Sequence, residues 1–169
     1  MTDRGGTRER DNIHVTPAET LELTKVADDL GYHSVWVAEA YGFDAPTFMG
    51  YLAAKTESIT IGAGILPIYT RTPTLMAMTA ASMDTLTDGR FILGLGASGP
   101  QVVEGWYGQP YPKPLARTRE YIDIVRNIVR REAPLEHHGE FYDLPLQGGA
   151  GLGKPLKSTI HPLRKEIPI

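Results

Sequence analysis

Short, almost uniformly apolar runs alternate with helix-like segments along this chain, and this alternation constrains the fold more than any other feature. The runs Ser34–Ala38, Ile59–Leu66 and Phe91–Gly96 are typical of strands that are covered on both faces. Segments of helical periodicity lie between them. This order predicts an α/β fold with parallel strands joined by right-handed helical crossovers. Ligands of such folds bind at the carboxyl ends of the strands, so the residues just after each run are the informative ones.

Four helices are expected in this alternation. Thr16-Pro17-Ala18-Glu19 is a capping box with proline at the first helical position. The apolar spacing that follows predicts one helix face made of Leu23, Val26, Ala27 and Leu30. Asp44-Ala45-Pro46 predicts the start of a second, short helix, and Thr72-Pro73 predicts the start of a third. The segment Leu115–Arg131 has the clearest helical stripe in the chain.

Chain length limits how much of a barrel these elements can form. The sequence has 169 residues, whereas a complete (β/α)₈ barrel needs ~200 or more. We divide it into a charged N-terminal segment, residues 1–15, and one α/β domain, residues 16–169. Within the domain we expect about three strand–helix units, an irregular stretch over residues 133–160, and the start of a further buried strand at Ile167-Pro168-Ile169.

Composition and charge exclude several classes of function. The chain has no cysteine, so disulfides, thiolate metal sites and a cysteine nucleophile are excluded. The histidines lack the spacing of a helical metal site, and no metal is expected. The net charge of −3, without a basic stripe, gives no case for nucleic acid. No apolar run approaches the ~20 residues that span a bilayer, and no signal peptide is evident, so we expect no membrane partner and a cytoplasmic protein.

Two glycine-rich runs are similar to nucleotide-binding motifs. Gly94–Gly99 matches G-x-G-x-x-G after a strand, but Pro100 follows it, and Glu120, at the distance of the ribose-binding acid, lies within the clearest helix. We therefore disfavour a dinucleotide fold and expect a tight loop whose backbone N–H groups face a ligand phosphate. Gly148–Lys154 is similar to a phosphate-binding loop, but Pro155 replaces the required Ser or Thr, which favours a mobile loop.

Several residues near the predicted strand ends are candidates for a site. Glu39 follows the first strand, where barrel active sites form, and its alternative is a solvated carboxylate in a loop. Gly62 and Gly64 leave a gap in side chains that lets a flat ring or a second backbone approach, or marks a bulge. Arg90 begins its strand at the opposite end, which indicates a structural role. The aromatic residues over 106–111 could stack on a ring or pack under a proline-rich loop.

Three runs, in this order and spacing, resemble the bacterial luciferase-like monooxygenase superfamily: Ser34–Glu39, Ile61–Leu66 with Arg71-Thr72-Pro73, and Gly89–Gly96. The stretch Gly94–Ile128, with its Gly99–Gly108 run, is most similar to the coenzyme F420-dependent oxidoreductase branch. The resemblance extends from about Thr16 to Ile169. It implies the N-terminal half of a (β/α)₈ TIM barrel, without a clear first strand and without the C-terminal half.

The resemblance also implies a set of cofactor-binding residues. A deazaflavin coenzyme, F420, or FMN in the sister branch, would lie at the carboxyl ends of the strands. A non-prolyl cis peptide at Gly64–Ile65 would support the middle of the ring. Glu39 matches the family's acidic residue after the second barrel strand and is the candidate for a catalytic role, while Ala40 stands where members often have histidine. Ser98, Gly99 and Gln101 match the loop that contacts the polar edge of the ring or the tail.

The implied activity is hydride transfer between F420 and a small organic substrate. One alternative is an FMN-dependent monooxygenase of the same superfamily. Another is a non-catalytic, truncated fragment that needs a partner chain, because an open half-barrel exposes strand edges and an apolar interior. A homo-oligomer or a barrel-completing chain is therefore an expected partner.

Overall fold

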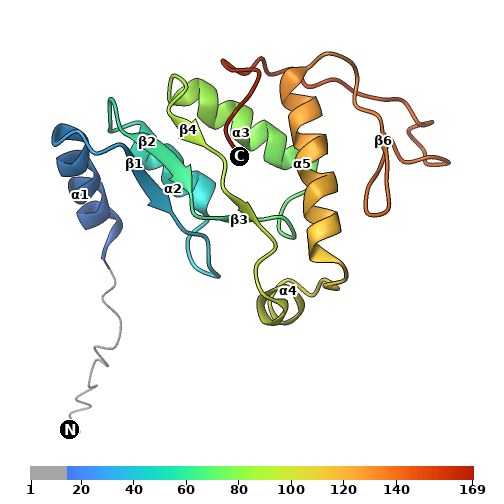
Figure 1. Ribbon diagram of the computed structural model, residues 1–169, viewed down its shortest axis with the longest axis horizontal. Helices are drawn as coiled ribbons and strands as arrows, with labels where there is room; N and C mark the ends of the chain where they lie inside the picture. Colours follow the sequence, from blue (N-terminus) through green and yellow to red (C-terminus); the bar gives the residue numbers. More distant parts are fainter. Residues whose placement is uncertain (1–14) are drawn as a thin grey trace, which may run out of the picture.

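The computed structural model describes residues 15–169, and within them helices alternate with strands as expected (Figure 1). The charged segment, and with it the expectation that a clear first strand is missing, falls almost entirely on residues 1–14, outside the described part. The helices are α1 (Pro17–Asp29), α2 (Ala45–Ala53), α3 (Pro73–Leu86), α4 (Pro100–Gly105) and α5 (Pro114–Arg130). The strands are β1 (Ser34–Val37), β2 (Thr60–Ala63), β3 (Leu66–Pro67), β4 (Phe91–Ile92), β5 (Leu95–Gly96), β6 (His137–His138) and β7 (Asp143–Leu144).

The strands that carry the site are parallel. β1 pairs with β2 in a register that places Trp36 beside Gly62, and β2 pairs with β4. The Leu93 amide then donates to the Pro168 carbonyl at 2.9 Å. This bond brings the C-terminal residues close to the end of β4, but residues 167–169 form no strand, so the further strand expected from the sequence stays a prediction. β3 and β5 form a second parallel pair beyond the first sheet.

Two strands expected to be continuous are each interrupted. The run Ile59–Leu66 divides into β2 and β3, and Phe91–Gly96 divides into β4 and β5. The interruptions lie where the two backbones come very close, because a Cβ placed on Gly94 would stand 1.8 Å from the carbonyl oxygen of Ala63. Gly94 is thus needed for this contact, and the continuous-strand prediction was wrong at these positions.

The helix starts are confirmed by their capping side chains. Thr16 accepts a hydrogen bond from the Glu19 amide, and the Glu19 carboxylate accepts one from the Thr16 amide, which completes the capping box. Asp44 accepts from the Thr47 amide, and Thr72 from the Leu75 amide. Each side chain satisfies an amide that the first helical turn leaves unpaired.

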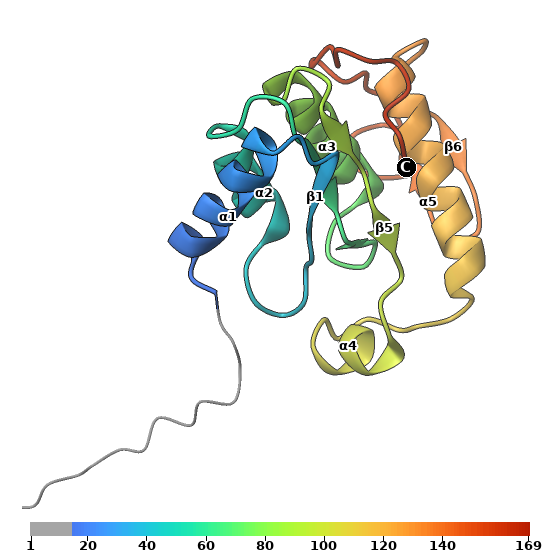
Figure 2. The same ribbon diagram turned by 60° about the vertical axis from the view of Figure 1, so that its left-hand side comes forward.

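The predicted apolar face of α1 is wrong. Leu23, Val26 and Leu30 are 63%, 53% and 71% exposed, and the buried residues of the helix are Leu21 and Thr24. The helix lies at one end of the row α1, α2, α3, α5 and is covered on one side only (Figures 1 and 2). Its apolar stripe therefore faces solvent in the isolated chain.

α4 is a helix that the sequence argument treated as loop. Gly99 is its N-cap and Pro100 its first residue. The prediction that Pro100 disfavours a helix at this turn is wrong, because proline suits a first helical position, where its missing N–H has no partner to lose. The turn after β5 therefore does open into a helix, although only of six residues.

The core lies between the sheet and the helices. Its largest fully buried side chains include Ile61 and Phe91 from the strands, Met49 and Met76 from α2 and α3, and Tyr121 from α5. The opposite face of the sheet is open, and Trp36 is 54% exposed. Helices on one face of curved parallel strands, with the other face open, form a partial (β/α)₈ barrel.

Two carboxylates fasten the irregular C-terminal part to the helices. Glu120 accepts hydrogen bonds from the Phe141 and Tyr142 amides and lies 2.9 Å from His137 Nε2, which holds the β6–β7 hairpin against α5. Glu120 is therefore a structural residue in this chain. Asp84, fully buried in α3, accepts from Arg164 Nε at 2.6 Å and from the Arg164 amide at 2.8 Å.

Candidate functional site

The predicted site residues lie just after the ends of β1, β2 and β5, at the carboxyl rim of the open barrel. Glu39 follows β1, the Gly64–Ile65 pair follows β2, and Ser98 follows β5. The Gly64 amide donates to the Val37 carbonyl at 2.7 Å, which brings the ends of β1 and β2 together. The sequence predicts that the informative residues lie just after the strands, and the parallel register brings these strand ends to one rim.

Glu39 is mostly buried and paired, not solvated. Its side chain is 10% exposed, and its two oxygens accept from Arg71 Nη1 at 2.7 Å and Nη2 at 2.9 Å. The second oxygen also accepts from the Ala45 amide at the start of α2. The reading of Glu39 as a loop carboxylate in water was therefore wrong. Its geometry holds the carboxylate in one orientation and leaves it no freedom to turn.

Arg71 is the residue that sequence reasoning missed. It bridges Glu39 to the Asp44 carboxylate, which lies 2.5 Å from Nη2. Burial by itself would lower the pKa of Arg71, but the two carboxylates raise it above its usual value. The only signal in the sequence was its place in the Arg71-Thr72-Pro73 run after the second predicted strand, a position at the rim.

Tyr107 lies near this ion pair. Burial raises the pKa of its phenol, and the Glu39 carboxylate raises it further, while Arg71 opposes the shift. Tyr107 therefore stays a neutral hydrogen-bonding group near Glu39 over the ordinary pH range. It follows α4, so the helix missed in the sequence brings a side chain to the site.

The Gly64–Ile65 backbone offers an open surface at the strand break. Its peptide is cis, as the resemblance implied. Gly64 is exposed, and a Cβ placed there would meet only ordinary contacts, the nearest being Trp36 Cβ at 3.6 Å. The Trp36 ring covers the neighbouring Gly62 so closely that a Cβ on Gly62 would lie 2.5 Å from it. The backbone at Gly64 is therefore exposed beside the Trp36 indole and carries no side chain of its own.

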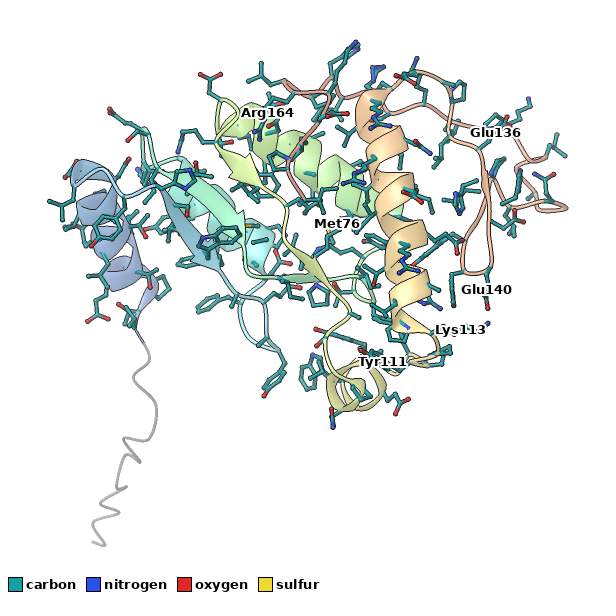
Figure 3. The ribbon with its side chains drawn as sticks, viewed as in Figure 1. Met76, Tyr111, Lys113, Glu136, Glu140 and Arg164 are labelled. Atoms are coloured by element: carbon teal, nitrogen blue, oxygen red, sulfur yellow. The ribbon has the colours of Figure 1, made fainter. Side chains whose placement is uncertain are left out.

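Two stacked tyrosines, Tyr111 and Tyr69, support the loop after β5. Ser98 adopts a left-handed conformation, φ +58°, and its carbonyl accepts from the Tyr111 hydroxyl at 2.7 Å. Tyr111, beside α4 in Figure 3, stacks on Tyr69 with ring centroids 5.7 Å apart. The Gln101 side-chain oxygen lies over Gly99, 3.1 Å from where a Cβ would stand. Tyr111 thus packs under the loop, one of the two readings the sequence left open.

The remaining rim residues are exposed. Ala40 is exposed. Tyr41, 69% exposed, contacts the 65% exposed Trp106 at a centroid distance of 6.2 Å. This contact joins the loop before α2 to the end of α4. Exposed aromatic side chains at the rim offer stacking surfaces for a ligand.

Other features of the chain lie away from this rim. Pockets of about 520 Å³ and 510 Å³ lie beside the C-terminal segment and beside residues 133–160, respectively. Across residues 15–169, no group of three or more His, Cys, Asp or Glu side chains is arranged to hold a metal ion. Within that range, no helix is both long and apolar enough to cross a membrane. Arg90, at the other end of its strand, donates to the Ile59 and Thr56 carbonyls, which confirms its structural role.

Comparison with known proteins decides the family. The sequence matches the luciferase-like monooxygenase family over residues 2–169. The chain belongs to this family. The match agrees with the parallel half-barrel and with the resemblance seen in the strand runs.

Similar proteins include enzymes of both branches of the family. One is a Mycobacterium tuberculosis protein named "Putative coenzyme F420-dependent oxidoreductase", 52% identical over 155 residues, which are 90% of this chain and 45% of that protein. The solved F420-dependent tetrahydromethanopterin reductase of Methanopyrus kandleri has a TM-score of 0.67 at 25% identity, covering 85% of this chain and 44% of that one. The oxygenating component of 3,6-diketocamphane monooxygenase from Pseudomonas putida, solved with FMN, shares the fold, with a TM-score of 0.72 at 21% identity, covering 98% of this chain and 48% of that one.

The chain therefore spans less than half the length of these relatives. The family members among them are oxidoreductases and monooxygenases that use F420 or a flavin.

Proposed function

We propose that this chain supplies the ring-binding rim of an F420-dependent oxidoreductase that acts on a small organic substrate. The bound deazaflavin would supply hydride transfer at its C5 carbon. The chain's own residues would bind and orient the ring and keep water away from one of its faces. Because the chain covers less than half of its relatives, the activity of the whole enzyme is part of the proposal.

The observation that carries the proposal is the open backbone at Gly64–Ile65. An exposed glycine at the break between β2 and β3, next to the Trp36 ring, matches the flat face of a tricyclic ring. Ser98 and Gly99 would contact the polar edge of the ring from the neighbouring strand end, and Gln101 would reach the same edge or the tail. The 52% identity to the mycobacterial relative favours F420 over FMN.

Glu39 has a positioning role in this proposal. Its two oxygens are already occupied by Arg71 and the Ala45 amide, so the carboxylate is poorly placed to shuttle a proton. It instead holds Arg71 and the start of α2 together under the ring. The geometry thus supports a fixed charge near the ring and gives no support for Glu39 as the catalytic acid.

The test is a titration of the purified chain with F420, followed through the fluorescence of the deazaflavin, with FMN in parallel. Saturable binding of F420 in preference to FMN is expected. Preferential binding of FMN would favour the monooxygenase alternative. Binding of neither would contradict the proposal for this chain and favour the non-catalytic alternative.

A matched pair of variants tests the ring surface itself. Gly64→Val places a branched side chain on the open backbone, where the ring would lie, and should weaken F420 binding at least ~tenfold, equivalent to ~1.4 kcal/mol. Gly50→Ala, in α2, adds a Cβ that meets nothing within 4 Å and should leave binding unchanged. Equal binding by both variants would remove Gly64 from the site.

A further inference from the structure

One of the two larger pockets lies on the outer side of the helices, away from the rim. Residues 133–160 run along the side of α5 that faces away from the strands (Figures 1 and 2). The pocket of about 510 Å³ lies between this segment, α3 and α5, and its volume is within the range of small-molecule sites. Its lining comes entirely from residues 74–160 and includes none of the candidate ring-binding residues. The pocket is therefore separate from the proposed ring surface.

The floor of the pocket is one side of α3 together with one residue of α5. Thr74, Met78 and Ser82 recur at every fourth position, so they lie along the same side of α3. Ile128 of α5, which packs partly against the core, lies beside them. The two helices pack against each other and are anchored by their buried residues. The floor is therefore formed by the fold itself.

Hydrogen bonds hold the irregular segment in place over this floor. The Leu135 amide donates to the Leu156 carbonyl at 2.9 Å, and Arg131 Nε donates to the Ser158 carbonyl at 3.1 Å. The β6–β7 hairpin, which is fastened to α5, adds Leu144 to the lining. Backbone contacts thus fix the walls, although the segment that supplies them has little regular structure.

The lining is mainly aliphatic, and part of it is uncovered. Six lining residues are Leu, Ile or Met, and none is aromatic. Met78 and Leu156 are 52% and 80% exposed. A ligand that covered them would remove apolar surface from water, which favours binding. Because no ring in the lining can stack on a flat ligand, the pocket favours an aliphatic body.

The charged groups of the lining are all basic. Lys154 and Lys157 are exposed, so they lie at the mouth of the pocket. Within residues 15–169 neither ammonium is paired with a carboxylate, and Lys157 Nζ donates to the Glu132 carbonyl at 3.4 Å. Ser158 and Thr159 follow directly and add hydroxyl donors. Two cations and two hydroxyls, with no carboxylate in the lining, are complementary to an anionic group.

We propose that this pocket binds a small aliphatic molecule that carries one anionic group. The aliphatic body would lie on Met78 and Ile128, and the anionic group would lie between Lys154 and Lys157. This inference goes beyond the proposed function and does not depend on it, because the pocket shares no residue with the ring-binding rim.

The first test is calorimetric titration of the purified chain with adamantane-1-carboxylate and, in parallel, with 1-adamantylammonium. The two probes share one aliphatic body and differ in the sign of their charge. Saturable binding of one carboxylate per chain is expected, at least ~fivefold tighter than binding of the ammonium, and it should weaken as salt is raised. Equal affinity for the two probes, or no saturable binding of the carboxylate, would overturn the proposal.

A charge-reversed variant distinguishes this pocket from other apolar surfaces of the chain. The double variant Lys154→Glu with Lys157→Glu should raise the dissociation constant of the carboxylate at least ~tenfold and reverse the preference between the two probes. Lys55→Glu, at an exposed lysine outside the lining, is the matched control and should change the affinity less than ~twofold. All three lysines are exposed, so both variants should keep their circular dichroism. A double variant that binds the carboxylate as tightly as the unaltered chain would contradict the proposal.

The methionine methyl groups show where the probe binds. In a chain labelled with carbon-13 at these methyl groups, the Met78 resonance should shift in step with the calorimetric binding curve, because Met78 lines the pocket. Met49 on α2, which is fully buried and outside the lining, is the internal control and should not shift. Binding that leaves the Met78 resonance unmoved would place the probe elsewhere on the chain and rule out this pocket.

Discussion

The Glu39–Arg71 pair has both partners almost buried, with side chains 10% exposed. Bidentate pairs of this kind are directional, because the planar guanidinium matches the carboxylate fork. Removing one partner leaves the other charge buried without compensation, which costs more than the pair itself contributes. Arg71 also holds Asp44, the cap of α2, so one side chain connects the rim loops after β1 and β3.

Arg71→Met should lower the free energy of unfolding by about 3 kcal/mol, because Glu39 is left as a buried, unpaired carboxylate. Arg71→Lys keeps the charge but loses the second hydrogen bond to Glu39, so it should lower the free energy of unfolding by less than Arg71→Met does. Urea unfolding followed by circular dichroism measures both. Lys25→Met, which removes a lysine from an exposed pair with Glu22, serves as the control and should change stability by less than ~0.5 kcal/mol. A loss for Arg71→Met no larger than this control would contradict the buried-pair account.

For single residues, the sequence predicts which positions reach the site but not which partners they contact there. Position after a strand was enough to select Glu39, whereas Gly64 was selected for its missing side chain within a predicted strand and Ser98 through the family resemblance. It could not show that Glu39 is ion-paired, since its partner lies 32 residues away and depends on how the loop after β3 returns. Residue type alone does not distinguish a paired carboxylate from a solvated one.

At the scale of elements, carboxylates fasten segments that have little regular structure of their own. The β6–β7 hairpin has two residues in each strand, too few for independent stability, and it is held by Glu120 on α5. Burial would raise the pKa of Glu120, but hydrogen bonds from His137 and from the Tyr142 and Phe141 amides together lower it below its usual value. Glu120 therefore makes the docking of the hairpin sensitive to acid.

The stability that Glu120 contributes should be complete above its unfolded pKa of about 4.3 and be lost as the pH falls through its lower, folded pKa. Backbone hydrogen exchange at Phe141 and Tyr142, corrected for intrinsic rates, should become faster as the pH falls below 5. The comparison is with exchange of the buried amides of α5. Glu120→Gln should exchange faster at neutral pH and lose this dependence. A hairpin whose protection is the same in both proteins and at both pH values would show that Glu120 does not hold it.

Helix starts were the most predictable elements, because a capping side chain and a first-turn proline are local signals that tertiary contacts seldom override. Thr16, Asp44 and Thr72 each cap the helix that the sequence assigned to them. The apolar face of α1 was not predictable, because periodicity shows that a helix has a stripe but not which neighbour the stripe meets. The breaks in the two strands depend on one backbone contact, between Gly94 and Ala63, which no local signal reveals.

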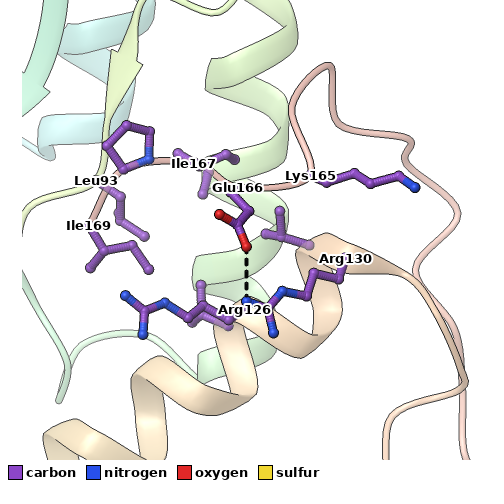
Figure 4. A pocket seen from close by; sticks show the side chains of 11 residues that line it. Leu93, Arg126, Arg130, Lys165, Glu166, Ile167 and Ile169 are labelled. Carbon is purple, nitrogen blue, oxygen red and sulfur yellow. Dashed lines mark hydrogen bonds and ion pairs between the residues drawn. The ribbon is translucent and has the colours of Figure 1, made fainter.

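At the scale of the whole molecule, a buried ion pair holds the C-terminal segment against α3 and β4. Asp84 is fully buried and ties Arg164 to α3, and Arg164 Nη2 donates to the Phe91 carbonyl on β4 at 2.6 Å. These contacts lie at the turn before residues 167–169. They fix the segment whose Pro168 carbonyl accepts from the Leu93 amide and which lines the pocket of about 520 Å³ (Figure 4).

Asp84→Asn keeps the shape of the side chain but removes its charge, and it should loosen this segment without unfolding the sheet. Exchange of the Leu93 amide, which donates to Pro168, should then accelerate relative to amides between β1 and β2. Unchanged exchange at Leu93 would place the anchor of the segment elsewhere.

The exposure of Trp36, whose ring covers Gly62, has a consequence for the fluorescence of the chain. The chain has two tryptophans, and Trp36 and Trp106 are 54% and 65% exposed. Neither indole belongs to the buried core. Ultraviolet emission from the folded chain should therefore have a long-wavelength maximum close to that of the denatured chain. It should shift to shorter wavelengths when a bound ligand covers these indoles, which gives a label-free binding signal.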